Sequence, residues 1–93
     1  MPTNEELGRA IRRQRRKRRM TIEDLAHAAD IHPTYLSGIE RGIRNPTWTK
    51  LTNLADGLST PLSNLIRDAE TEAQLSSRVQ AARDELGLSE NLG

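Results

Sequence analysis

The stretch from Thr21 to Asn45, TIEDLAHAADIHPTYLSGIERGIRN, constrains the fold of this 93-residue chain more than any other part of it. At its start, the Thr21 hydroxyl can accept a hydrogen bond from the amide of Glu23 or Asp24 and so cap a helix. Apolar residues then recur at helical spacing at Ile22, Leu25, Ala26 and Ala29. This pattern predicts a short helix that begins directly after Thr21.

A second short helix is predicted to begin at Pro33, because the first residue of a helix has no partner for an amide hydrogen and proline carries none. Gly42 follows as the expected left-handed stop. At about 100° per residue, one side of this helix gathers the residues that we expect to be buried, Leu36, Ile39, Glu40 and Ile43. The opposite side carries small and polar residues, Thr34, Gly38 and Arg41. Such a pair of helices has a shape that fits the major groove of DNA.

These residues resemble the helix-turn-helix of the phage lambda repressor and Cro family, also called the XRE family. The matching positions occur in order and at the family's spacing: Leu25, Ala26, Ile31, Pro33, Thr34, Leu36, Ser37, Ile39, Glu40, Arg41, Gly42, Asn45, Pro46, Leu51, Leu54, Ala55 and Leu58. The resemblance covers residues 7–65, roughly two thirds of the chain. It implies an all-α fold, with a compact five-helix DNA-binding domain in residues 1–67.

The remaining helices of that domain are predicted from caps and spacing. The first runs from Asn4 to about Lys17, with Thr3 or Asn4 as its cap and an inward side formed by Leu7, Ala10, Ile11 and Gln14. Thr47 caps the fourth helix, whose expected core residues are Trp48, Leu51, Leu54, Ala55 and Leu58. The fifth starts at Thr60 and Pro61 and turns Leu62, Leu65 and Ile66 inward.

Residues 68–93 depart from the five-helix pattern. A further amphipathic helix is predicted from Thr71 to Leu86, because one stripe carries Leu75, Val79, Ala82 and Leu86. This stripe must be buried, either against the domain or against a second copy of the chain. The final residues, SENLG, are expected to fray.

Charge is distributed unevenly along the chain. Residues 1–50 carry eleven Lys and Arg against six Asp and Glu, whereas residues 51–93 carry three against seven. Eight of the basic residues lie between Arg9 and Arg19. In an average protein such a run is a solvated helix face, but beside a helix that enters DNA it is expected to neutralise phosphate.

The resemblance also implies which residues contact DNA. Base contacts in relatives match Pro33, Thr34 and Gly38, and flanking contacts match Tyr35, Ser37 and Arg41. Since proline and glycine offer no side-chain hydrogen bond, we expect few direct base contacts and a contribution from DNA shape. The favoured partner of Arg44 is a phosphate, although Arg41 or Arg44 reaches guanine if the helix sits deep. The full set expected to bind DNA is Thr21, Pro33, Thr34, Tyr35, Ser37, Gly38, Arg41, Arg44, Asn45 and Lys50.

Arg15 and Glu40 match a family ion pair between the first and third helices and are expected to be structural. The chain departs from the family at Arg19 and Asp30, where relatives often have glycine, and at Ile22, where they often have glutamine. Arg19 is expected to adopt a left-handed conformation or to change the turn. Asp30 tolerates left-handed geometry, and Ile22 is not expected to contact DNA.

Other classes of function find little support in the sequence. There is no cysteine, and His27 and His32 fall on different elements without a ligand pattern, so we expect no metal, cofactor or enzymatic activity. No apolar run of about 18 residues is present, so no membrane partner is expected, and the absence of cysteine suits a reducing cytoplasm. The resemblance implies a protein encoded by a bacterium or a phage. The resemblance implies a sequence-specific transcriptional regulator, a repressor or a controller, that acts as a homodimer. Its expected partner is double-stranded DNA with a pseudo-palindromic operator, and helix 33–41 is expected to enter the major groove. The alternative is a protein-interaction module, such as an antitoxin or anti-activator, that uses the acidic residues 68–93.

Overall fold

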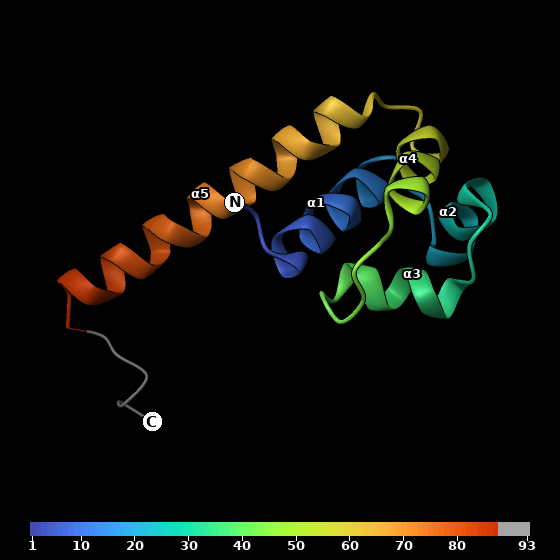
Figure 1. The fold of residues 1–93 in the computed structure, drawn as a ribbon. Coiled ribbons are helices and arrows are strands. Elements are labelled where there is room, and N and C mark those ends of the chain that lie inside the picture. Colours follow the sequence, from blue (N-terminus) through green and yellow to red (C-terminus); the bar gives the residue numbers. More distant parts are fainter. Residues whose placement is uncertain (88–93) are drawn as a thin grey trace.

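The structure is a computed structural model that describes residues 1–87 as five helices, without a strand among those residues. The helices are α1 (Asn4–Lys17), α2 (Ile22–Ala29), α3 (Pro33–Glu40), α4 (Trp48–Gly57) and α5 (Leu62–Glu85). Figure 1 shows α5 along one side of α1 and α3 along the other, with α2 and α4 at one end. The predicted all-α fold is confirmed, and none of the described helices is long and apolar enough to cross a membrane.

Short polar residues start the first, second and fourth helices as predicted. The Glu6 amide donates to the Thr3 hydroxyl at 3.2 Å, and the Asp24 amide donates to the Thr21 hydroxyl at 3.0 Å. The Thr3 and Thr21 amides donate in return to the Glu6 and Asp24 carboxylates, which lowers the pKa of both carboxyls. Thr47 caps α4 through its hydroxyl. The helix boundaries are therefore set largely by local sequence.

Left-handed residues end several of these helices. Gly42 has φ of 79°, which confirms the predicted stop after α3, and Asp30 has φ of 55° at the end of α2. Arg19 also takes the left-handed conformation, with φ of 57°, rather than changing the turn between α1 and α2. A residue with a β-carbon is strained there, so the turn depends on support from its surroundings.

The core is aliphatic and receives side chains from all five helices. Its buried members are Ala10, Ile11, Leu25, Ala26, Ala29, Leu36, Ile39, Leu51, Leu54, Ala55, Leu58, Leu65 and Ala69. At Gly8, an added β-carbon would collide with the backbone carbonyl oxygens of Ile39 and Glu40. The backbones of α1 and α3 therefore touch, and only glycine permits this approach.

Two predicted core residues are exposed. Trp48 is 71% exposed because it is the first residue of α4, one turn before Leu51, where the helix first meets the core. Ile43 is 65% exposed because α3 ends at Glu40, so the helical angle that placed Ile43 beside Leu36 does not continue that far. Both predictions were wrong because they extended a helical pattern beyond the packed part of the helix.

The predicted helix from Thr71 to Leu86 exists as the C-terminal half of α5 rather than as a separate element. No glycine or proline interrupts the sequence from Leu62 to Glu85, so the helix continues through the boundary expected between residues 67 and 68. Its second half extends away from the other helices (Figure 1). The expected fraying of SENLG concerns residues 89–93, which lie outside the described part of the chain.

An ionic cluster that sequence reasoning missed marks the last buried contact of α5. Glu72 is buried and pairs with Arg13 and, at 3.2 Å, with Arg9, which also donates to the Ser76 hydroxyl. One turn earlier, Gln14 donates to Asp68. The signal was present, because Glu72 continues the spacing of the buried residues Leu65 and Ala69. The cluster fastens the middle of α5 to α1.

A second buried ion pair joins α1 to α3. The Arg15 guanidinium donates from Nε to Glu40 Oε2 at 2.7 Å and from Nη2 to Oε1 at 3.0 Å. Its Nη1 donates to the Met20 carbonyl at 2.8 Å, in the segment between α1 and α2. The hydrogen bonds to Glu40 raise the pKa of Arg15, which keeps the pair charged. One arginine thus joins three segments of the chain.

Replacing Glu40 by glutamine should leave the Arg15 charge buried without a counter-charge. We expect Glu40→Gln to lower the free energy of unfolding by about 3 to 5 kcal/mol, the usual cost of breaking a buried ion pair. Urea denaturation followed by circular dichroism measures this. The control is Glu70→Gln, which removes the same charge from an exposed position on α5 and should change stability by less than about 0.5 kcal/mol. Equal effects of the two variants would show that the Arg15–Glu40 pair does not hold α3.

Candidate nucleic-acid interface

A tight turn sets the angle between α2 and α3. The amides of Asp30 and Ile31 donate back to the carbonyls of His27 and Ala26 at 3.2 and 2.9 Å, which closes the end of α2. The chain then enters α3 through His32, whose ring nitrogen accepts from the Thr34 amide at 3.1 Å. Two eight-residue helices are thereby joined at a fixed geometry.

The two sides of α3 differ as predicted near its start. Leu36 and Ile39 are fully buried, whereas Thr34 and Arg41 are exposed. Pro33, Tyr35 and Ser37 are half-buried and flank the exposed side. Figure 1 shows that α3 lies at the margin of the molecule, on the opposite side of α1 from α5. Its outward side is therefore accessible to a large partner.

Gly38 departs from the expected picture of an open outward side. It is buried, and the Arg44 side chain lies against it. The amides of Ile43 and Arg44 both donate to the Gly38 carbonyl, at 2.9 and 3.1 Å. The loop after α3 therefore folds back over the middle of the helix, and the Arg44 side chain covers the position where Gly38 has no side chain of its own.

Cationic and polar groups surround the outward side of α3. Arg44 and Asn45 are exposed in the loop, and Lys50 is half-buried in the first turn of α4. The first intrahelical bond of α4 runs from Leu51 to Thr47, and the Lys50 amide donates to the Thr47 hydroxyl, so the amides of Trp48 and Thr49 point out of the helix end. Thr21 is exposed at the start of α2, but its hydroxyl already caps that helix.

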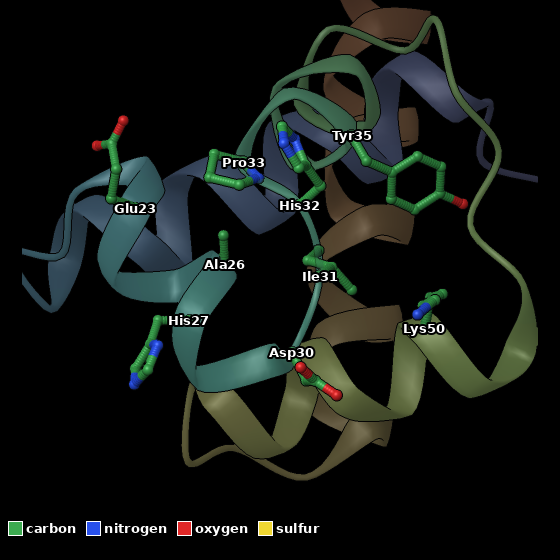
Figure 2. A pocket seen from close by; sticks show the side chains of 9 residues that line it. All are labelled: Glu23, Ala26, His27, Asp30, Ile31, His32, Pro33, Tyr35 and Lys50. Atoms are coloured by element: carbon green, nitrogen blue, oxygen red, sulfur yellow. The ribbon is translucent and has the colours of Figure 1, made fainter.

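A groove of mixed charge lies between α2, α3 and α4. Figure 2 shows Tyr35 and Lys50 along one side of it, while Glu23 and His27 project from α2. The carboxylates of Glu23 and Asp30 outnumber the single lysine, which makes this groove a poor site for phosphate. Within residues 1–87, no three His, Cys, Asp or Glu residues are grouped to hold a metal ion. The groove therefore lies at the border of the surface that carries Arg41 and Arg44.

The basic run from Arg9 to Arg19 does not form one surface beside α3. Arg15 is buried against Glu40, while Arg9 and Arg13 pair with Glu72 at the junction of α1 and α5. Exposed cations remain along the same junction at Arg12, Arg16 and Lys17. The cations expected to neutralise phosphate are therefore divided between structural pairs and a surface that faces α5.

Comparisons with known protein sequences agree with this geometry. A family model described as a helix-turn-helix domain matches residues 6–66. Two uncharacterised HTH-type transcriptional regulators, from Mycobacterium bovis and Mycobacterium tuberculosis, are 33% identical over 82 residues, or 85% of this chain and 32% of each relative. The HTH-type transcriptional regulator DdrOP3 of Deinococcus deserti is 35% identical over 60 residues, which cover 64% of this chain and 46% of the relative. The chain thus spans less than half the length of these relatives.

Solved structures show the same arrangement of helices. The clp gene regulator ClgR from Corynebacterium glutamicum has a TM-score of 0.78 and 28% identity, over 86% of each chain. The restriction-modification controller protein C.Esp1396I, bound to a 19 base pair DNA duplex, has a TM-score of 0.70 and 31% identity over 75% of this chain and 93% of its own. Matched over residues 6–66 and sharing its fold with these regulators, the chain belongs to the helix-turn-helix domain family, in its XRE type.

Proposed function

We propose that this chain is a sequence-specific double-stranded DNA-binding transcriptional regulator of the cytoplasm, which inserts the helix 33–41 into the major groove. The observation that carries the proposal is the two-sided character of α3. Leu36 and Ile39 anchor the helix in the core, and Thr34 and Arg41 remain accessible. An α-helix presented in this way matches the width of the major groove.

The surroundings of α3 support a polyanionic partner. Arg41 ends α3, Arg44 lies in the loop after it, and Lys50 lies in the first turn of α4, where it borders the groove that also holds Glu23 and Asp30. Phosphate neutralisation by such cations supplies much of the affinity of a small DNA-binding domain. One of the similar solved structures is itself bound to a DNA duplex. We assign DNA binding to residues 1–67 and a separate role to the extension.

The second half of α5 supports a homodimer. Leu75, Val79 and Leu86 are 45%, 56% and 73% exposed, although they share one stripe of the helix. Half a helix that projects without packing is marginally stable in water, so this stripe gains most from pairing with a second copy. A two-fold dimer would present two α3 helices to half-sites roughly one turn of DNA apart, on a pseudo-palindromic operator.

The alternative function, a protein-interaction module with an acidic tail, has less support from the described residues. Asp68 is bound to Gln14, and Glu72 is buried between Arg9 and Arg13. Between residues 73 and 87, two arginines balance Asp84 and Glu85. Residues 68–87 carry five carboxylates against two arginines, but Glu72 is paired with arginines of α1 and residues 73–87 are balanced. The most distinctive feature of the described extension is therefore its apolar stripe.

Wild-type protein should bind its operator with an affinity that falls steeply as salt rises, because binding releases counterions from DNA. Thr34→Ala should lose about 1 to 3 kcal/mol of discrimination at one or two base pairs, since Thr34 is the exposed side chain at the start of α3. Fluorescence anisotropy with the operator and its single base-pair variants measures both quantities. The control is Thr71→Ala, at an exposed threonine on α5. Weak DNA binding without salt dependence would instead favour the alternative function, a protein-interaction module.

Placing a charge on the stripe of α5 should break the dimer. Val79→Glu would bury an unpaired carboxylate at the contact, and we expect it to weaken self-association by about 30-fold or more. Sedimentation equilibrium measures this in the absence of DNA. Ser77→Glu adds the same charge on the opposite side of the helix and should leave the dimer intact. A monomeric wild-type protein, or equal effects of both variants, would contradict the assigned interface.

A further inference from the structure

We propose that Arg44, which belongs to the loop and not to α3, contacts a guanine base by extending over the surface of α3 at Gly38. The inference rests on the proposed DNA-binding function and assigns a specificity-determining residue within it. It also revises the expectation that Arg44 contacts a phosphate. The reason is that the aliphatic part of the Arg44 side chain lies against Gly38.

The Arg44 stem occupies the space that a side chain at position 38 would fill. A β-carbon built on Gly38 would lie 2.6 Å from Arg44 Cγ, 3.5 Å from Cβ and 3.7 Å from Cδ. Gly38 falls on the outward side of α3 between Thr34 and Arg41, and it is buried although both of those residues are exposed. Arg44 thus supplies the side chain that α3 lacks at this position.

Backbone hydrogen bonds hold Arg44 in this place. Its amide and that of Ile43 donate to the same Gly38 carbonyl, and the Gly42 amide donates to Ile39 at 3.0 Å. Gly42 takes the left-handed conformation that turns the chain back toward the helix. The loop is therefore ordered in the free protein, and less conformational entropy is lost when the arginine binds.

Guanine is the base that suits this group. An arginine guanidinium can donate two parallel hydrogen bonds to guanine O6 and N7 in the major groove. Pro33 and Gly38 carry no donor side chain, so α3 offers few groups of its own for this purpose. The Arg44 stem lies against α3 at Gly38, between the exposed residues Thr34 and Arg41. A helix inserted in the major groove would therefore carry this arginine into the groove with it.

Gly38 provides a way to move Arg44 without removing its charge. In Gly38→Ala the added carbon would lie 2.6 Å from Arg44 Cγ, so the Arg44 side chain must move from its place over α3. Alanine is also a better helix former than glycine, so α3 should not be weakened. Gly38→Ala and Arg44→Ala should therefore affect the same base pair through one shared contact.

The test begins with selection of an operator by the full wild-type chain from a random duplex library. Affinities for the operator and for each single base-pair variant of its half-site are then measured at two salt concentrations. The variants are Arg44→Ala, Arg44→Lys, Gly38→Ala and the double variant. Arg67→Ala is the control, because it removes an exposed arginine from α5. Thermal melting confirms that each variant is folded.

We expect Arg44→Ala to reduce the preference for one G·C pair by on the order of 10-fold to 100-fold. Gly38→Ala should reduce the preference at the same pair, and the double variant should lose no more than Arg44→Ala. Arg44→Lys keeps the charge but not the paired hydrogen bonds, so it should lose the preference while retaining the salt dependence. Arg67→Ala should leave the base-pair profile unchanged.

Two results would overturn the inference. One is an Arg44→Ala variant that weakens all sequences equally, lowers the salt slope by about one unit and is rescued by lysine, which identifies a phosphate contact. The other is a Gly38→Ala variant with the wild-type base-pair profile. In both cases the wild-type chain would still bind a defined operator. Failure to select any operator would instead contradict the proposed function itself.

Discussion

The buried pair of Arg15 and Glu40 is the interaction on which the placement of α3 depends. It joins the last turn of α3 to α1, and through the Met20 carbonyl it also fixes the segment that leads into α2. At Gly8 the backbones of α1 and α3 are in direct contact, so the two helices pack as closely as their main chains allow. Because one side of α3 is fastened so firmly, the other side is free to carry small and polar residues.

In the proposed DNA complex, the side chains that this side of α3 presents come from more than one segment. Thr34 and Arg41 belong to α3, whereas Arg44 arrives from the loop and lies over Gly38. A short helix with a proline at its start and a glycine in its middle has few hydrogen-bond donors of its own, and the following loop compensates for this. The cations of α1 have a different use, since three of them form ion pairs with Glu40 or Glu72. The exposed polar and cationic side chains of α3 and its loop therefore differ in role from the arginines of α1 that form buried or half-buried ion pairs.

Much of the fold follows from local sequence, and the failures share one physical cause. The caps at Thr3, Thr21 and Thr47 and the stop at Gly42 depend on neighbouring residues, so they were predictable. The exposure of Trp48 depends on where helices meet in space, which helical spacing does not specify. The burial of Glu72 follows the spacing of Leu65 and Ala69, but its partners Arg9 and Arg13 come from another helix. The position of Arg44 over Gly38 requires the loop to fold back, and no periodic pattern carries that information.

The central claim is that the outward side of α3 and the loop after it form the surface that binds DNA. Amide NMR spectra of the full chain, recorded during titration with its selected operator duplex, test this residue by residue. We expect the largest chemical-shift changes at the amides of Thr34, Arg41 and Arg44, with smaller changes at the starts of α2 and α4. Changes confined to the junction of α1 and α5, or to the second half of α5, would contradict it.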